Sequence, residues 1–401
     1  MYLTHLSLTN YRAFTRLDMD MPRRILLLVG DNAQGKTSLL EAVYYLATLT
    51  SFHAQHDRQL INFFAQNDAL AVARLVADYE RNGQAHRMEV RVIQEGGRNG
   101  SGTRVRKEIL VDGLRCSAQN ALGNFTAVIF LPQMMRILEG GPDERRRYLN
   151  LALAQVVPGY AQALSEYTQA LTQRNALLKQ LAERGGDADQ LLYWDELLTR
   201  RGAFIIRARI AAVEDLETEA AIIHNRISNN QEMLRMVYQP SFDPLTNPPG
   251  QYSLPVHLPA ARTTISEEEI RAGFAKRLAA QRGEEIARGV TTTGPHRDEL
   301  RVLANGIDLG DFGSRGQVRT ALLSMKLAEL NWMKRKSGEW PVLLLDEILA
   351  ELDIQRRADL LAYLGSCEQA VLSTTDLNLF KSEFVQQHTV WQVKAGQIDP
   401  L

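Results

Sequence analysis

The sequence has little of what would staple a small secreted protein together or anchor a protein in a membrane. Its two cysteines, Cys116 and Cys367, exclude a disulfide framework and any zinc site built from several cysteines, so both are expected to be small core residues. The longest apolar runs, such as 25–29 and 342–345, fall far short of the roughly 20 residues of a membrane helix. Because the polar start also lacks a signal-peptide pattern, we expect a cytoplasmic protein with no membrane partner.

Net charge is scarce as well. The formal value of −1 provides no overall field that would draw the protein onto nucleic acid, so any affinity for DNA must come from local basic patches or from geometry created on assembly. In contrast, 401 residues with 45% hydrophobic content can bury more than one core. We therefore expect two compact units, or one domain with a large insertion.

Strand patterns dominate both ends of the chain, and helical periodicity dominates the middle. Apolar and polar residues alternate near the start, and short apolar runs follow at 25–29, 342–346 and 370–374. Within 143–289, apolar residues recur three, four or seven apart, as in two long amphipathic helices folded back at a glycine-rich break, with a further helix after a capping box at Ser266. We predict an α/β head formed by 1–142 and 290–401, with 143–289 as an inserted, mostly helical arm.

A phosphate loop follows the first apolar strand. Residues 30–37 fit G-x-x-x-x-G-K-[ST] at every fixed position and precede a helix, which is the context that such a loop requires. Lys36 is expected to reach the outer phosphates of ATP, and the Thr37 hydroxyl to hold Mg²⁺. The residues expected to line the phosphates are Gly30, Asp31, Asn32, Ala33, Gln34, Gly35, Lys36, Thr37 and Ser38.

Two carboxylates end the apolar run at 342–345. Asp346 is expected to bind Mg²⁺, and Glu347 to align or deprotonate the attacking water, because both roles need a carboxylate beside the terminal phosphate. Lys36 and Glu347 are therefore the expected catalytic residues.

A second anion-binding turn lies at 312–317, directly before a predicted helix. One nucleotide needs only one such turn, so the surplus predicts a homodimer in which Ser314, Gly316 and Gln317 of one chain contact ATP held by another. The alternative is a simple N-capped helix.

These three pieces resemble the heads of ABC-type ATPases that include SMC and Rad50 proteins. The resemblance implies that 350–353 crosses the dimer interface, with Asp353 near the nucleotide, and that Thr374 or Thr375 senses the terminal phosphate. Finer motifs at 10–14, 39–47, 140–149 and 291–300 resemble the RecF family of bacterial recombination mediators. Gln133 stands where that family has acidic residues after a proline, so whether it contacts the metal-bound water stays open.

The RecF resemblance implies a weak, DNA-stimulated ATPase that uses hydrolysis as a dimerisation switch. It implies binding to double-stranded and gapped DNA, partners of the RecR and RecO type, and help in loading RecA during gap repair and the SOS response, in the cytoplasm at the nucleoid. The alternative is an SMC- or Rad50-like structural chromosome ATPase, which would need a much longer coiled coil than 160–227 provides.

For several residues the sequence is compatible with either a functional or a structural role. Arg12 either touches the nucleotide or is a surface arginine, and a structural role is expected for His296, since 296–298 lacks the asparagine that a kinase loop requires. Arginines are candidates for DNA contacts or for ordinary solvated faces. These are Arg98, Arg104, Arg106, Arg145, Arg146, Arg147, Arg200, Arg201, Arg207 and Arg209.

Overall fold

The computed structural model describes residues 1–68, 70–96, 104–244 and 262–401. The chain divides into two compact units, of which the first combines 1–134 with 323–401 and the second spans 135–322. The sequence placed the boundaries at 142/143 and 289/290, so residues 290–322, expected in the head, pack with the helical unit instead. Arg98 and the prolines at 248, 249, 255 and 259 lie outside the described residues.

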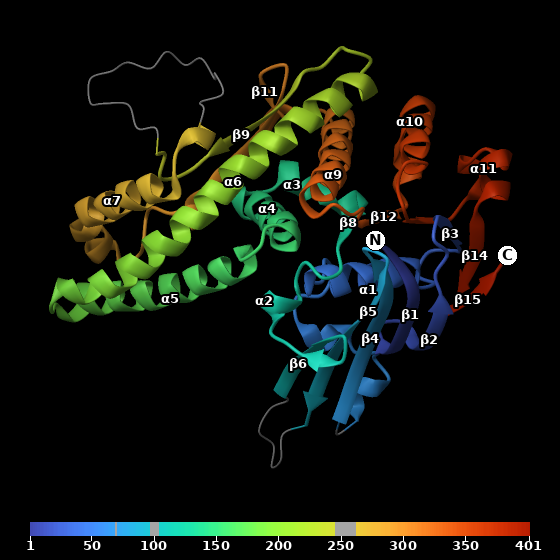
Figure 1. Cartoon of the computed structure of the whole chain (residues 1–401), viewed down its shortest axis with the longest axis horizontal. Coiled ribbons are helices and arrows are strands. Elements are labelled where there is room, and N and C mark those ends of the chain that lie inside the picture. Colours follow the sequence, from blue (N-terminus) through green and yellow to red (C-terminus); the bar gives the residue numbers. More distant parts are fainter. Residues whose placement is uncertain (69, 97–103, 245–261) are drawn as a thin grey trace. The chain divides into compact units, whose positions relative to one another are not determined.

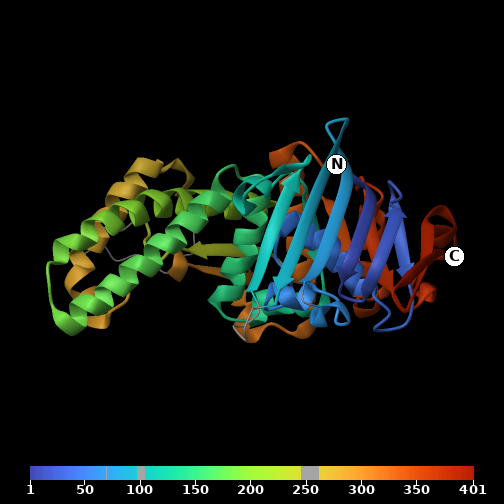
Figure 2. The same ribbon diagram turned by 90° about the horizontal axis from the view of Figure 1, so that it is seen from below.

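An antiparallel sheet forms one layer of the first unit (Figure 2). Its order is β2-β1-β4-β5-β6-β7, and every neighbouring pair is antiparallel. The strands are β1 (Tyr2–Tyr11), β2 (Phe14–Asp20), β4 (Leu70–Arg81), β5 (Gln84–Glu95), β6 (Arg104–Val111) and β7 (Leu114–Arg115). Side chains that point inward are apolar, as the alternation in the sequence predicted, and β1 buries Leu3, Leu6 and Leu8 completely.

The second sheet has the order β15-β14-β3-β13-β12-β8 and is parallel except for β15. The strands are β3 (Ile25–Val29), β8 (Ala127–Phe130), β12 (Val342–Asp346), β13 (Ala370–Thr374), β14 (Thr389–Lys394) and β15 (Gln397–Pro400). Every residue of β8, β12 and β13 is buried, because the strands of a parallel sheet are covered on both faces. The carboxyl ends of these strands therefore meet at one edge.

Helix α1 (Lys36–Thr48) packs against strands of both sheets. Eleven of its residues are buried, which is why this stretch is apolar nearly all round rather than on one stripe. Shorter elements complete the described part of this unit. They are η1 (Asp57–Leu60), η2 (Ala65–Asn67), α2 (Ala118–Ala121), η4 (Pro132–Met135), η8 (Ile348–Glu351), α10 (Ile354–Leu364), η9 (Leu377–Leu379) and α11 (Ser382–Gln387).

The second unit is built around the predicted pair of long helices, α5 (Tyr160–Arg184) and α6 (Leu191–Ile227), which lie side by side in Figure 1. Helix α7 (Glu267–Arg288) packs on both and begins with the predicted capping box of Ser266 and Glu269. The remaining elements are α3 (Arg136–Glu139), α4 (Pro142–Val156), β9 (Leu234–Gln239), η6 (Arg262–Thr264), η7 (Pro295–Arg297), β10 (Glu299–Ala304), β11 (Ile307–Asp308) and α8 (Leu309–Phe312). Helix α9 (Arg315–Ser337) contains the boundary between the units.

The predicted α/β class with a helical insertion is confirmed. None of the described helices combines the length and the apolar stretch required to span a bilayer. Both cysteines are free thiols, and Cys367 is buried while Cys116 is half-buried.

Several of the arginines proposed for DNA contacts hold the second unit together. Arg209 is 1% exposed; its Nη1 donates to Asp298 Oδ2 at 2.8 Å and to the Pro295 carbonyl at 2.6 Å. Arg145 pairs with Glu299 at 2.7 Å. A fully buried arginine cannot contact a nucleic-acid backbone without unfolding its surroundings, so the interpretation of Arg209 as a DNA contact is wrong.

The buried pair of Arg209 and Asp298 predicts that substitutions of two arginines of α6 differ strongly in their effect on the free energy of unfolding. Arg209→Ala leaves the buried Asp298 carboxylate without its cation and should lower the free energy of unfolding by about 3–5 kcal/mol. Arg200→Ala, at an exposed position of the same helix, should change it by less than about 0.5 kcal/mol. Urea titration of both variants checks this, and equal midpoints would contradict it.

Candidate nucleotide site

The predicted phosphate loop connects β3 to α1 and closes around the lysine. Lys36 is 4% exposed, and its Nζ donates to the carbonyl oxygens of Gly30 at 2.6 Å and Asp31 at 3.0 Å. The same nitrogen lies 3.0 Å from Glu347 Oε1. The structure therefore brings together the two residues that the sequence predicted as catalytic, although one begins α1 and the other follows β12.

Two glycines of the loop are fixed by local geometry. A Cβ on Gly30 would lie 2.2 Å from the Val393 carbonyl oxygen, and Gly35 has a φ of 118°, where a side chain would be strained. Gln34 has a further role that the sequence did not assign, because its side-chain Oε1 accepts a hydrogen bond from the Ala395 amide at 2.7 Å. The loop is thus anchored to the turn between β14 and β15, which the sequence did not indicate.

The carboxylate of Asp346 is held by two hydroxyls. Thr37 Oγ1 donates to Asp346 Oδ2 at 2.8 Å, and Ser373 Oγ donates to the other oxygen. Asp346 is 5% exposed, so its charge is compensated by these donors rather than by water. Ser373 was missed by sequence reasoning; the signal was its place one residue before Thr374 on the strand that pairs with β12.

Glu347 adopts a left-handed conformation with a φ of 53°, which is uncommon for a residue with a side chain and is found at functional sites. Thr375 Oγ1 donates to Glu347 Oε2 at 3.4 Å. Thr374, one of the two residues that the resemblance offered as sensor, is 1% exposed and bonds within its own turn to Asp376. The structure therefore brings Thr375, and not Thr374, to the carboxylate.

Two other predicted residues are less closely joined to this centre. Gln133 is exposed on η4, beyond the end of β8; among the described residues no hydrogen bond joins it to Thr37 or Asp346. Asp353 caps α10, since its Oδ1 accepts from the Arg356 amide at 2.9 Å and its Oδ2 pairs with Arg356 Nη1 at 2.9 Å. Its side chain thus has a structural role that the sequence did not assign.

The Ser-x-Gly-Gln turn lies in the second unit, at the start of α9. Ser314 Oγ accepts from the Gln317 amide at 3.3 Å, and Gln317 Oε1 accepts from the Ser314 amide at 3.0 Å. The N-cap that was the alternative reading is therefore present. However, Ser314 and Gly316 are exposed, and a Cβ on Gly316 would meet only Ser314 Oγ, at 4.0 Å. Contacts within the described chain do not explain the glycine.

A cavity of about 380 Å³ opens beside the start of α1. Arg12, Thr37 and Ser38 contribute to its wall, which is the neighbourhood that the sequence predicted for Arg12. The other lining residues are Ala13, Glu41, His53, Gln59, Ile61, Phe63 and Gln66.

The residues at the sheet edge fit a magnesium ion that is shared with phosphates. Among the described residues, no group of three or more His, Cys, Asp and Glu side chains could hold a metal ion by itself. Mg²⁺ typically binds through one or two carboxylates together with substrate phosphates and water. Thr37 and Asp346, which already share a hydrogen bond of 2.8 Å, are the oxygen donors suited to this role.

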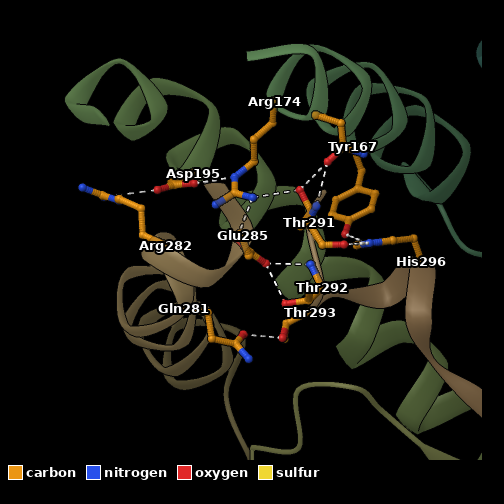
Figure 3. Close-up of polar contacts among 11 residues, drawn as sticks. Tyr167, Arg174, Asp195, Gln281, Arg282, Glu285, Thr291, Thr292, Thr293 and His296 are labelled. Carbon is orange, nitrogen blue, oxygen red and sulfur yellow. Dashed lines mark hydrogen bonds and ion pairs between the residues drawn. The ribbon is translucent and has the colours of Figure 1, made fainter. Parts of the chain in front are cut away.

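The segment after α7, singled out in the sequence at 291–300, forms a buried polar network in the second unit (Figure 3). Arg174 is 0% exposed and donates to Asp195 at 2.7 Å and to Thr291 at 2.8 Å. It also lies 2.7 Å from Glu285, whose other oxygen accepts from the Thr292 amide at 2.6 Å. These contacts join α5, α6 and α7 to one turn, so the motif stabilises the helical unit.

His296 belongs to the same network. Its Nε2 donates to the Thr291 carbonyl, and its Nδ1 accepts from the Tyr167 hydroxyl at 2.6 Å. A carbonyl can only accept, which fixes this neutral tautomer. Burial lowers the pKa of His296 to about 4, and the charges of Arg297, Arg146 and Arg174 act in the same direction. The structural role expected for His296 agrees with this geometry.

Comparison with known proteins identifies the class to which this arrangement belongs. Residues 2–397 match the RecF/RecN/SMC N terminal domain family. An SMC head domain from Pyrococcus furiosus aligns with a TM-score of 0.51 at 14% identity, covering 100% of this chain and 96% of that one, so it shares the fold. The chain is an ATPase head of the ABC type that includes SMC proteins, as predicted.

Closer relatives define the family within that class. The DNA replication and repair protein RecF of Chloroflexus aurantiacus is 38% identical over 99% of both chains, and that of Roseiflexus castenholzii is 37% identical over 100% of both. A structure of the recombination mediator protein RecF-ATPrS in the RecFOR pathway aligns with a TM-score of 0.82 at 29% identity, covering 100% of this chain and 98% of that one. The chain belongs to the RecF family.

The lowered pKa of His296 predicts a pH-dependent stability. In the unfolded chain the imidazole takes up a proton near pH 6.5, whereas the folded one stays neutral down to about pH 4. The contribution of the neutral His296 to the free energy of unfolding is therefore fully present above pH 6.5. It is lost as the pH falls toward 4, by roughly 3 kcal/mol in total. Urea unfolding between pH 7 and 4 should show a shallower loss for His296→Gln than for the unmodified protein.

His5→Gln is the control for this measurement, because the pKa of His5 is raised by its hydrogen bond to Asp20. The stability that His5 contributes is lost as the pH rises. Removing the His5 imidazole therefore cannot make the loss of stability between pH 7 and 4 shallower. If His296→Gln lost stability toward pH 4 as steeply as the unmodified protein does, the neutral, buried His296 would be contradicted.

Proposed function

We propose that the protein is an ATP-dependent DNA clamp of recombinational gap repair, in which two copies close around nucleotide. The observation that carries the proposal is the joining of Lys36, Thr37, Asp346 and Glu347 at one sheet edge, through contacts of 2.8 Å and 3.0 Å. The solved relative named RecF-ATPrS supports ATP as the nucleotide. The curated relatives, named for DNA replication and repair, support DNA as the partner.

Each residue of the edge has a part in ATP hydrolysis. The Lys36 ammonium and the loop amides neutralise the outer phosphates. Thr37 and Asp346 would hold Mg²⁺, which supplies further positive charge at the phosphate oxygens. Glu347 accepts the proton of the water whose oxygen bonds to the terminal phosphorus, as the bond from that phosphorus to ADP breaks. Thr375 holds the carboxylate in place at 3.4 Å.

The second anion-binding turn supports assembly. Ser314 and Gly316 are exposed, and nothing described within the chain requires a glycine at 316. A phosphate brought by another copy would require one, because a glycine lets backbone amides approach an anion closely. Dimerisation with ATP would then place the turn of one copy, and Asp353 at the start of α10, beside the nucleotide of the other. Hydrolysis would release the dimer.

DNA binding is proposed for the assembled form, at gaps and junctions of single and double strands. Exposed arginines such as Arg104, Arg200 and Arg207 suit contacts to backbone phosphates, which would make binding fall with salt. Weak turnover stimulated by DNA, partners of the RecR and RecO type, and loading of RecA complete the proposal. A structural chromosome ATPase is not favoured, because α5 and α6 have 25 and 37 residues.

Light scattering tests the composite site. In Glu347→Gln, where loss of the carboxylate slows hydrolysis, the mass should double on addition of ATP. A second change, Ser314→Arg, should keep this variant monomeric, because the larger side chain fills the turn meant for phosphate. Ser366→Arg, at another exposed serine, should still dimerise. ATP leaving Glu347→Gln monomeric would refute the composite site.

Binding to duplex DNA tests the coupling to nucleotide. Lys36→Met removes the ammonium that would hold the outer phosphates, so ATP should no longer increase the affinity of the protein for duplex or gapped DNA. Lys381→Met, at an exposed lysine of the first unit, should respond to ATP as the unmodified protein does. Fluorescence anisotropy with labelled DNA measures this. An unchanged ATP response in Lys36→Met would separate DNA binding from the nucleotide.

A further inference from the structure

The turn between β1 and β2 holds Arg12 in a strained conformation. Its φ is 51°, in the left-handed region that residues other than glycine, asparagine and aspartate seldom adopt. The turn is fixed around it, since the Arg12 amide donates to the Leu60 carbonyl at 2.9 Å and Asn62 Nδ2 donates to the Arg12 carbonyl at 2.7 Å. Backbone strain that is held by surrounding contacts is a feature of binding and catalytic sites.

The side chain of Arg12 is fixed by a carboxylate of α1. Arg12 Nε donates to Glu41 Oε2 at 2.8 Å, and Nη2 donates to Glu41 Oε1 at 2.9 Å. Such a bidentate pair fixes the plane of the guanidinium as well as its position. Glu41 is 1% exposed and also accepts from the Ser51 hydroxyl. Neither Glu41 nor Ser51 stands out in the sequence as a site residue.

Glu41 lies on the helix that begins at the phosphate loop. It follows Thr37 by four residues and Ser38 by three, so all three side chains share one face of α1. Arg12, Thr37, Ser38 and Glu41 all line the cavity of about 380 Å³. The helix that would present hydroxyls to phosphates therefore also carries the carboxylate that fixes an arginine beside them.

The guanidinium keeps donors for a ligand. Three of its five N–H groups donate to the two oxygens of Glu41 and, from Nη1 at 3.2 Å, to the Gln59 carbonyl. The Tyr11 hydroxyl also interacts with this guanidinium. Its side chain is 22% exposed. The guanidinium borders the cavity, where an anionic or carbonyl oxygen of a ligand can accept from the N–H groups that Glu41 and Gln59 leave over.

We propose that Glu41 is a positioning residue for nucleotide binding, which holds Arg12 so that its free N–H groups face the ligand. The inference rests on the function proposed above, because it takes the cavity beside α1 to be occupied by part of the nucleotide. Glu41 itself touches no ligand. Its bidentate pair fixes the direction of Arg12, and the Ser51 hydroxyl holds Glu41 in turn.

Substitution by glutamine separates this role from simple space filling. Glu41→Gln keeps the shape but replaces one acceptor by an NH₂ group, which cannot accept from Arg12 or Ser51. Arg12 is then free to leave the cavity wall. The affinity of the full chain for ADP with Mg²⁺, which binds without turnover, should fall at least about tenfold, the size of one charge-assisted hydrogen bond.

A double-mutant cycle shows whether Glu41 acts through Arg12. Arg12→Gln alone should weaken ADP binding by at least as much as Glu41→Gln, and the double variant should bind no more weakly than Arg12→Gln. Non-additive losses are expected for residues that act as one unit. Where Glu41→Gln fails to show a cooperative unfolding transition, Glu41→Asp, which keeps the charge but shortens the reach, takes its place in the cycle.

The first unit offers a matched control. Arg74 and Glu89 form a similar bidentate pair on β4 and β5, with bonds of 2.7 Å and 2.8 Å, and Glu89 is 7% exposed. Glu89→Gln removes a comparable interaction away from the residues that line the cavity. It should leave the affinity for ADP unchanged.

Calorimetric titration with ADP distinguishes the outcomes. ADP binding by Glu41→Gln equal to that of the unmodified protein would overturn the positioning role while leaving the proposed function intact. Additive losses in the double variant, or an equal loss in Glu89→Gln, would overturn it as well, since both indicate a general effect on stability. If the unmodified protein bound neither ADP nor ATP, the proposed function itself would fail.

Discussion

The hydrogen bond between Thr37 and Asp346 is the interaction on which the candidate site depends. The two residues are 309 positions apart in the chain, one at the start of α1 and the other at the end of β12. Asp346 is almost fully buried, so its charge requires donors, and Thr37 and Ser373 are the groups that provide them. The phosphate loop is thereby held against the sheet edge at which Glu347 lies 3.0 Å from Lys36.

Buried charge is used differently in the two units. In the first unit, the buried residues Lys36, Glu41 and Asp346 bond to the phosphate loop, to Arg12 and to Thr37, for which nucleotide binding is proposed. In the second unit, Arg174, Glu285 and Asp298 are as deeply buried, but their partners belong to neighbouring helices and turns. Their hydrogen bonds and ion pairs offset the cost of burying these charges. The run of threonines after α7 takes part in them, since Thr291 and Thr292 bond to Arg174 and Glu285.

Sequence patterns predicted the helices well where the periodic stretch was long, and the strands well where the apolar run was buried. The apolar runs at 342–345 and 370–374 form β12 and β13, and the two stretches with helical periodicity form α5 and α6, as predicted. The boundary of the helical unit was misplaced, because residues 290–322 pack with it. Packing of one segment on another depends on contacts between distant residues, and no local period reports them.

The sequence by itself determined the phosphate loop, the two carboxylates and the α/β class, because each depends on spacing within a short segment. Tertiary structure alone decided that Gln34 anchors the loop, that Thr375 rather than Thr374 reaches Glu347, and that Arg209 is buried. It also joined Glu41 to Arg12. Each of these contacts joins side chains from strands and helices that are distant in the sequence. The residues that neighbour a side chain along the chain do not determine which of these distant groups it contacts.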